Sequence, residues 1–197
     1  MDHREIRQII AEERRLYVPA QPLFMKISHQ KRYLIWKTLS SFRWAQYWKT
    51  EMQNNQVGVC RRLFAKLAYR YYFRQRNIYS ERSGVEIASH STMGRRTDIW
   101  HGGVIISGHL GNDCVIHGNN VIGSKGKHGG AIPVLGDRVD LGVGAVVIGC
   151  VRVADGCQIG ANAVVNKDFN EPNCLIVGIP AYVKGNEYAI QCMHPSL

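Results

Sequence analysis

The sequence lacks the features that mark several protein classes. None of its apolar runs approaches the roughly 18 residues that a membrane-spanning helix requires. The N-terminal stretch MDHREIRQII mixes acids with bases and has no apolar segment behind it, which argues against a secretory signal. The six cysteines form no CxxC pair, so neither a zinc site nor a disulfide framework is indicated. We therefore expect a cytoplasmic protein with reduced thiols and no bound metal.

Negative charge is scarce in the first part of the chain. Residues 1–82 hold 17 Lys and Arg against 6 Asp and Glu, whereas residues 83–197 hold 8 against 9. The whole excess of the formal net charge of +10 therefore lies in the first part. This change in composition predicts a basic N-terminal segment at 1–82, a second domain at 83–183 and a C-terminal tail at 184–197.

Three stretches of the basic segment have the apolar spacing of helices. They are residues 2–17, residues 31–52 and residues 59–77, and Pro19 and Pro22 interrupt the pattern after the first. The apolar residues expected on their buried faces are Ile6, Ile9 and Ile10, then Leu34, Ile35, Leu39, Phe42 and Tyr47, then Leu63, Phe64, Leu67 and Tyr71.

Basic residues interleaved with aromatic residues in this segment raise the question of its partner. Nucleic acid is one interpretation, but no nucleic-acid motif accompanies the charge, and solvated arginines on amphipathic helices are the favoured alternative. Contact of residues 1–82 with an anionic lipid surface or an anionic glycan is a third. The lipid alternative places the protein peripherally at the inner face of a membrane.

The second domain carries a repeat of six residues. An aliphatic residue begins each hexapeptide in LGNDCV/IHGNNV from Leu110 and in LGDRVD/LGVGAV/VIGCVR/VADGCQ/IGANAV from Leu135. The same interval continues upstream, with a slip of one before Leu110, at Met93, Ile99 and Ile105. A period of six predicts a solenoid of triangular coils whose aliphatic residues stack inside. The residues expected to fill the space near the corners are Cys114, Val139, Ala145, Val151, Cys157 and Ala163.

The ordered motifs GVEI, WHGGVII, IHGNNVIGSKGK, LGVGAVVIG, IGANAVVNKD and VGIPAYVK resemble those of the hexapeptide-repeat acyltransferases. They span about residues 84–183 and are similar to the serine acetyltransferase-like branch, in the style of capsule and O-antigen polysaccharide O-acetyltransferases. The resemblance implies a mainly β protein, a left-handed parallel β-helix preceded by a basic α-helical segment. It also implies a homotrimer that transfers acetyl from acetyl-CoA to a hydroxyl, with no metal.

The resemblance assigns the catalytic role to the histidine of WHGGVII, which is His101. An alcohol needs a base poised near neutral pH to take its proton, and imidazole suits this role. Gly102 and Gly103 leave room for a close approach of the substrates. The family places an aspartate where this chain has Glu86, so Glu86 is expected to orient the His101 ring.

An insertion of about seven residues, near SKGKHGG, interrupts the repeat between Ile122 and Leu135. By resemblance, backbone amides near Gly123 and Ser124 stabilise the oxyanion, and Lys125 and Lys127 favour the anionic coenzyme. His128 in this insertion and His117 on a repeat are candidate acceptor-site residues, although His117 is equally well explained as structural.

The remaining coenzyme positions are carried over from the resemblance. Glycines at tight corners also have a structural explanation, which holds whether or not they bind a ligand. The expected coenzyme-binding residues beyond the two lysines are Gly142, Val143, Gly144, Gly160, Ala161, Lys167, Gly178 and Pro180.

The chain departs from serine acetyltransferases at one position of the insertion. Where those enzymes have GGxxHP, this chain reads GGAIP, with Ile132 at the histidine position. This departure and the basic helices favour a sugar hydroxyl of a cell-surface polysaccharide, or of its precursor, as acceptor. The alternatives are serine O-acetylation, as in cysteine biosynthesis, and a non-catalytic trimeric scaffold.

Overall fold

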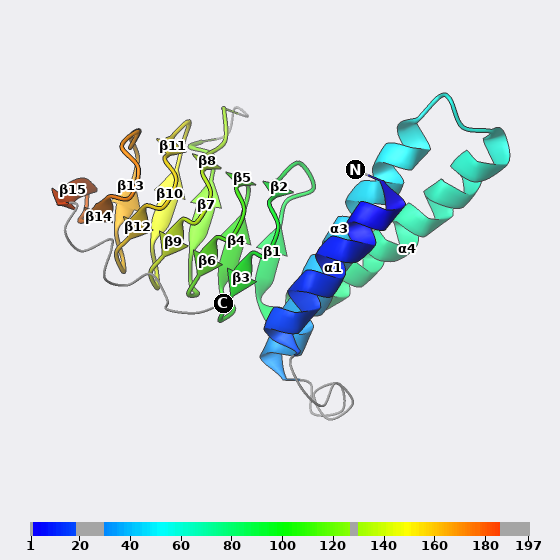
Figure 1. Cartoon of the computed structure of the whole chain (residues 1–197), viewed down its shortest axis with the longest axis horizontal. Helices are drawn as coiled ribbons and strands as arrows, with labels where there is room; N and C mark the ends of the chain where they lie inside the picture. The colour runs from blue at the N-terminus through cyan, green and yellow to red at the C-terminus, as the bar shows by residue number, and fades with distance from the viewer. Residues whose placement is uncertain (1, 19–29, 127–129, 186–197) are drawn as a thin grey trace. The chain divides into compact units, whose positions relative to one another are not determined.

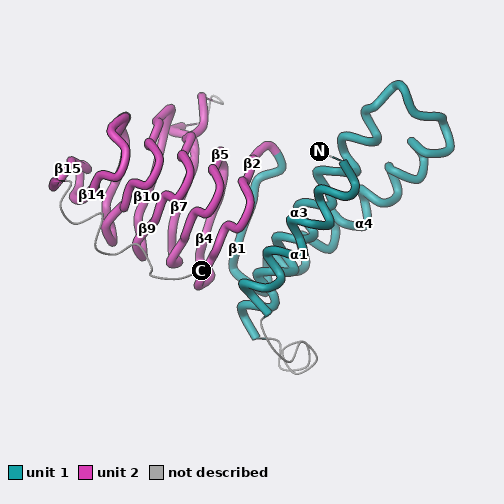
Figure 2. Tube along the Cα trace, viewed as in Figure 1, with its two compact units in different colours: residues 1–89 teal, residues 90–197 magenta. Residues whose placement is uncertain are grey.

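The hexapeptides form the successive coils of a solenoid in the computed structural model (Figure 1). The structure describes residues 2–18, 30–126 and 130–185. The chain divides into two compact units, residues 1–89 and residues 90–197 (Figure 2). The solenoid makes up the second unit and the helices make up most of the first.

Within the second unit, three sheets run along the solenoid, and their strands pair in parallel except for β14 with β15. Sheet 1 contains β4 (Val104–Ile106), β7 (Val121–Gly123), β10 (Val146–Ile148) and β13 (Val164–Val165). Sheet 2 contains β2 (Thr92–Met93), β5 (His109–Leu110), β8 (Val134–Leu135) and β11 (Arg152–Val153). Sheet 3 contains β3 (Asp98–Ile99), β6 (Val115–Ile116), β9 (Asp140–Leu141), β12 (Gln158–Ile159), β14 (Leu175–Val177) and β15 (Tyr182–Gly185). The chain passes from sheet 2 to sheet 3 to sheet 1 in each of about five turns.

The aliphatic residues of the repeat stack inside the solenoid, as predicted. In sheet 3, Ile99 pairs with Ile116 and Ile116 with Leu141, and all three are buried. The small residues predicted near the corners are buried as well, namely Cys114, Val139, Ala145, Val151, Cys157 and Ala163. Winding into coils removes one aliphatic side chain per hexapeptide from water, and this burial of apolar surface stabilises the solenoid.

The prediction for Ile105 is wrong. Ile105 is exposed, whereas Ile106 is buried and pairs with Ile122 in sheet 1. Ile106 follows Ile99 by seven residues, while Ile122 follows Ile116 by six. This coil therefore has one extra residue between Ile99 and Ile106. The register here is set by the hydrogen-bonded pairing of the strands, which the spacing of aliphatic residues along the sequence does not reveal.

The first unit contains the helices that the sequence predicts. These are α1 (His3–Tyr17), α3 (Lys31–Gln53) and α4 (Val59–Ser83), and the short strand β1 (Val85–Ile87) follows them. Asp2 caps α1 by accepting a 2.7 Å hydrogen bond from the backbone N–H of Glu5. Gly84, with φ of +71°, ends α4 in the left-handed conformation. None of these helices, in the part of the chain that the structure describes, has an apolar stretch long enough to cross a membrane.

The buried faces of α1 and α3 match the prediction in the main. Ile6 and Ile9 are buried in α1, and Ile10 is half-buried. The buried residues of α3 include all five that were expected, namely Leu34, Ile35, Leu39, Phe42 and Tyr47.

The predicted buried face of α4 is wrong. Its residues Leu63, Phe64, Leu67 and Tyr71 are exposed. The opposite side of α4 packs instead: Ala65 is fully buried, and the ring of Tyr72 stacks on Trp44 of α3 with 5.7 Å between centroids. The exposed side carries aromatic residues as well, and Phe64 contacts Trp48 of α3 edge-on with 5.4 Å between centroids, so the size of the side chains does not decide which side packs.

A buried ion pair joins α1 and α3. The Nε of Arg43 donates to Oε2 of Glu13 at 2.9 Å, and a second guanidinium nitrogen contacts Oε1. Burial raises the pKa of the Glu13 carboxyl, and the Arg43 charge opposes this shift. The pair therefore allows two charged side chains to lie inside the helical unit.

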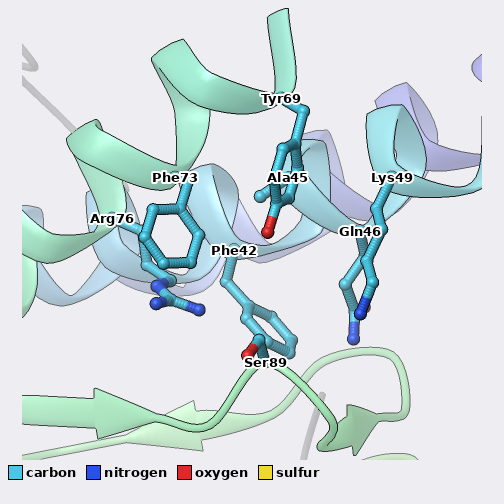
Figure 3. Close-up of a pocket in the computed structure, with 8 residues that line it drawn as sticks. All are labelled: Phe42, Ala45, Gln46, Lys49, Tyr69, Phe73, Arg76 and Ser89. Carbon is cyan, nitrogen blue, oxygen red and sulfur yellow. The ribbon is translucent and has the colours of Figure 1, made fainter. Parts of the chain in front are cut away.

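A small pocket also lies in the first unit (Figure 3). Phe42 of α3 and Tyr69, Phe73 and Arg76 of α4 are among the side chains that line it. It has room for about one water molecule, so it is too small for a coenzyme or a sugar.

The domain boundaries stay predictions. The first compact unit extends to Ser89 and includes β1, whereas the change in composition lies near residue 82. Residues 184 and 185 of the predicted tail belong to β15, and the rest of the tail lies outside the described residues, as do Pro19 and Pro22.

Candidate active site

His101 lies at the corner where the chain passes from sheet 3 to sheet 1. The equivalent corners of the following coils stack on it through backbone hydrogen bonds. We call this column the His101 edge, and it consists of residues 100–103, 117–119, 142–144 and 160–162. Trp100 N–H donates to Ile116 O at 2.9 Å, and Asn119 N–H donates to Gly102 O at 3.1 Å.

His101 is the extra residue at this edge. The pairing of β3 with β6 aligns Trp100 with His117, and the hydrogen bond from Asn119 aligns Gly102 with Gly118. One residue between Trp100 and Gly102 therefore has no counterpart in the next coil, and that residue is His101. An unpaired residue is pushed outward at a corner, and His101 is exposed.

Gly118 makes room for His101. A Cβ atom at position 118 would lie 2.7 Å from the Cβ of His101, which is closer than carbon atoms pack. Gly118 also has φ of +131°, a conformation that residues with side chains rarely adopt. The coil below His101 therefore approaches it with bare backbone.

Trp100 and His117 form an aromatic pair next to His101. Their ring centroids are 4.3 Å apart, and Trp100 Nε1 donates to Asp98 Oδ2 at 2.9 Å. His117 Nε2 lies 2.9 Å from Asp140 Oδ1, close enough for an ion pair but not aligned for a hydrogen bond. The sequence analysis singled out His117 but missed Trp100 and Asp140. The one sequence feature that could have indicated them is that each is next to an inward-facing residue of the repeat, Ile99 or Leu141.

A buried asparagine holds the His101 edge together. Asn120 is fully buried, accepts a hydrogen bond from Gly118 N–H at 2.8 Å, and donates to the carbonyl oxygens of Gly142 and Ala145 at 2.8 and 3.2 Å. It was missed as well, although a polar residue in a column of small residues such as Ala145 and Ala163 is a detectable signal.

Several predicted coenzyme residues lie along the same edge. Gly142, Val143 and Gly144 occupy the corner of the third coil, and Gly160 and Ala161 occupy that of the fourth. A Cβ at Gly142 would lie 2.7 Å from the backbone nitrogen of Ala161, so glycine there is required by the close approach of the coils. Gly178, with φ of +98°, and Pro180 follow β14 near the end of this column, where Val164 N–H donates to Gly178 O.

The predicted oxyanion and loop residues lie at a different edge. Gly123 ends β7, so Gly123, Ser124 and Lys125 begin the connection from sheet 1 to sheet 2. Gly149 N–H donates to Gly123 O at 2.9 Å, which places this corner on that of the next coil. Lys167 follows β13 at the same edge. A single copy of the chain therefore does not bring these residues to His101, because sheet 1 lies between the two edges.

Three further predicted residues are not placed relative to His101. Glu86 is exposed in the middle of β1 and belongs to the first compact unit, so its role in orienting His101 stays a prediction. Lys127 and His128 lie outside the described residues. Across the described ranges, no group of three or more His, Cys, Asp or Glu side chains could hold a metal ion.

Comparisons with known proteins match the repeat domain. No family model matches the chain. Serine acetyltransferase of Mycobacterium tuberculosis is 38% identical over 107 residues, which are 52% of this chain and 46% of that protein. A colanic acid biosynthesis acetyltransferase of Escherichia coli K12, WcaB, is 36% identical over 104 residues, which are 51% of this chain and 64% of that protein. The chain spans about half the length of the serine acetyltransferases that it matches.

Solved structures match almost the whole chain. Serine acetyltransferase of Neisseria gonorrhoeae has a TM-score of 0.67 at 24% identity, over 93% of this chain and 68% of that one. A serine acetyltransferase in complex with CoA has a TM-score of 0.64 at 20% identity, over 92% of this chain and 70% of that one. At these identities the structures establish the fold, a left-handed β-helix preceded by helices. Fold and relatives together fit a hexapeptide-repeat acyltransferase of the serine acetyltransferase-like branch.

Proposed function

We propose that the protein is an O-acetyltransferase that moves acetyl from acetyl-CoA to a hydroxyl, with His101 as the general base. The observation that carries this proposal is the extra residue at the His101 edge. It leaves the imidazole exposed directly above the bare backbone of Gly118. Relatives named serine acetyltransferase, and a serine acetyltransferase structure with CoA bound, support acetyl-CoA as the donor.

The proposed reaction needs one proton shuttle. His101 takes the proton of the acceptor hydroxyl while its oxygen attacks the thioester carbonyl carbon. The new C–O bond forms, the C–S bond breaks, and the imidazolium returns the proton to the leaving thiolate of CoA. The corners at Gly142–Gly144 and Gly160–Ala161 follow His101 along the same edge, and all of their residues except Val143 are Gly or Ala, which gives the extended coenzyme a path with few side chains in the way.

The corner that holds Gly123, Ser124 and Lys125, which we call the loop edge, takes part in the proposed reaction only in a second copy of the chain. Gly123, Ser124 and Lys125 are separated from His101 by sheet 1 within one copy. In the homotrimer that we propose, the loop edge of one copy lies beside the His101 edge of the next, so that the oxyanion amides and His101 act on one thioester.

A sugar hydroxyl of a cell-surface polysaccharide or its precursor is the acceptor that we favour. In the GGAIP stretch that ends the insertion, Ile132 stands where serine acetyltransferases have a histidine, so this chain lacks a polar side chain at that position. The similarity to WcaB, whose name includes colanic acid biosynthesis, supports a glycan acceptor. Trp100, whose ring is tilted by 42° against that of His117 beside His101, is an aromatic side chain of the kind that packs against sugar rings.

Serine is the second candidate acceptor. Its support is the identity of 38% with the serine acetyltransferase of M. tuberculosis over the repeat domain. The two candidates differ in what must be recognised, because serine presents a carboxylate and an ammonium group on one small molecule whereas a neutral sugar presents neither.

The test is CoA release from acetyl-CoA with each acceptor in turn, L-serine and a de-O-acetylated surface polysaccharide of the host. We expect release with the glycan, and a 10²- to 10⁴-fold lower turnover for His101→Ala, about the contribution of one acid–base catalyst. His109→Gln is the matched control, because His109 is a half-buried histidine of sheet 2 that hydrogen-bonds to Thr92.

Each outcome is informative. Release with serine at a rate equal to that with the glycan would replace our preferred acceptor and leave the catalytic assignment intact. Near wild-type turnover of His101→Ala would remove His101 as the base. Absence of CoA release with both acceptors would contradict the proposed acceptors.

A further inference from the structure

Helix α4 exposes two rows of side chains that follow it lengthwise. The apolar row, with exposed fractions between 58% and 65%, consists of Val59, Leu63, Leu67 and Tyr71. The cationic row, exposed as well, consists of Lys66, Arg70 and Arg74. Members of each row are four residues apart, and residues three or four apart are neighbours on a helix, so the two rows adjoin. Phe64, 60% exposed, lies on the far side of the apolar row from the cations.

The packing of α4 within its unit does not use these rows. Its other side carries the fully buried Ala65 and the Tyr72 ring that stacks on Trp44 of α3, and α4 runs along α3 for most of its length (Figure 1). Scattered single apolar side chains are common on protein surfaces, but a contiguous row is not. The apolar row is therefore a candidate binding surface.

The cationic row has no acidic partner among the residues that the structure describes. The acidic residue of α4, Glu81, follows Arg74 by seven residues, about two helical turns, so no cation of the row has a carboxylate three or four residues away on its own helix. Arg61, at the edge of the surface, is different because it pairs with Glu51 at 2.7 Å. The surface thus combines exposed apolar groups with unneutralised positive charge.

We propose that the apolar and cationic rows of α4 bind the surface of an anionic phospholipid bilayer. An amphipathic helix binds a membrane interface by inserting its apolar side chains at the acyl boundary while lysines and arginines meet the lipid headgroups. Each Lys or Arg near an anionic leaflet adds attraction that falls off within a Debye length. Helix α4 presents the apolar side chains and the cations together on one face.

Two other occupants fit the surface less well. A second copy that docks by the same face would bring the cationic rows of both copies together, and like charges in contact oppose association. A copy that docks by a different face, as in a ring of three, is the alternative that the light-scattering measurement below detects. A soluble anionic polymer would pair with the cations but leave Leu63 and Leu67 in water, so the apolar row would have no role. A bilayer surface provides acyl chains for the apolar row and anionic headgroups for the cationic row.

The test is co-sedimentation of the full chain with vesicles, in the absence of acetyl-CoA. Vesicles of phosphatidylcholine with about 30% phosphatidylglycerol, which carry a negative surface potential, are compared with vesicles of phosphatidylcholine alone. We expect binding to the anionic vesicles, weakened by added salt. Lys66→Gln/Arg70→Gln/Arg74→Gln is expected to lower the partition coefficient by roughly a hundredfold, and Leu63→Gln/Leu67→Gln by at least tenfold.

The charge control removes three exposed cations from the second unit, Arg138→Gln/Arg152→Gln/Lys184→Gln, and is expected to bind like the wild type. Because all substituted α4 side chains are exposed, circular dichroism is expected to show unchanged folding. The assay omits acetyl transfer, so its result is independent of the proposed enzymatic function.

Four outcomes would overturn the proposal. They are equal binding to neutral and anionic vesicles, equal loss of binding in the charge control, and no binding at low salt. The fourth is a change in oligomeric state of Leu63→Gln/Leu67→Gln by light scattering without a change in vesicle binding, which would assign the apolar row to a second copy.

Discussion

At the residue scale, the position of His101 is the main structural result. The imidazole is exposed because one more residue occupies its corner than occupies the corner of the next coil, and Gly118 leaves the space below it empty. Both features are local, since they depend on one inserted residue and one missing side chain. Small changes at this corner are therefore expected to move the imidazole without unfolding the solenoid.

Gly118→Ala tests this dependence. The new Cβ would lie 2.7 Å from the His101 Cβ, and alanine is strained at φ of +131°. We expect turnover to fall by roughly ten- to a hundredfold, as for a misplaced catalytic group, and stability to fall by more than about 1 kcal/mol. Steady-state kinetics and thermal unfolding measure the two effects. Gly58→Ala is the control, since Gly58 lies at the start of α4 with an ordinary φ of −61° and no atom beyond its chain neighbours lies within 4 Å of the added methyl group; equal losses in both variants would refute the explanation.

The cysteines test the interior of the coils. Burial raises the pKa of the Cys114 thiol to about 12, whereas Cys150 is exposed. The thiolate is the reactive form, so at pH 8 only roughly one Cys114 in ten thousand is reactive even before access is considered. We expect iodoacetamide to modify Cys150 in the native protein and Cys114 only after unfolding, as measured by peptide mapping. Modification of both at the same rate under native conditions would show that the coil opens.

At the element scale, the three helices differ in how much of their surface is packed, since α3 has no exposed residue between 32 and 49 whereas α4 exposes a row of apolar side chains. α1 and α3 bury the residues that helix periodicity singles out, and Glu13 and Arg43 add a buried ion pair between them. α4 packs through Ala65 and its aromatic rings, and so its leucines remain exposed. Periodicity identifies an apolar face, but the partner decides whether that face is buried.

Arg43→Met tests the ion pair between α1 and α3. Removing the guanidinium leaves the Glu13 carboxylate buried without a partner, so we expect a loss of about 3–5 kcal/mol in unfolding free energy at pH 7. The double variant Glu13→Leu/Arg43→Met is expected to recover most of it, because no buried charge remains. Chemical denaturation measures both.

The same variant has an expected pH dependence. The folded-state pKa of Glu13 is raised by burial, so the folded protein binds this proton more tightly than the unfolded chain does. Stability from this group therefore rises as pH falls through the interval between the two pKa values, and the loss in Arg43→Met is expected to shrink between pH 7 and pH 5. A loss that grows toward acid pH would contradict this assignment.

At the scale of the whole molecule, charge and fold divide the chain in similar ways. The basic residues are concentrated in the helical part, and the nearly neutral part forms the solenoid. The two proposals follow this division, since the proposed general base belongs to the solenoid and the lipid-binding rows to the helices. Each can fail without the other, because they rest on different side chains and are measured by different assays.

The sequence by itself determined the solenoid, its inward-facing residues with the exception of Ile106, and the three helices. One aliphatic residue in every six allows few ways to exclude water, so the coil follows from the pattern alone. It also singled out His101. Only the tertiary structure decided which residue is the extra one at the corner, because backbone pairing between coils sets that register. The structure likewise separated the loop residues from His101 by a sheet, added Trp100, Asn120 and Asp140, and left the α4 leucines exposed, since these outcomes depend on which surfaces meet and not on spacing along the chain.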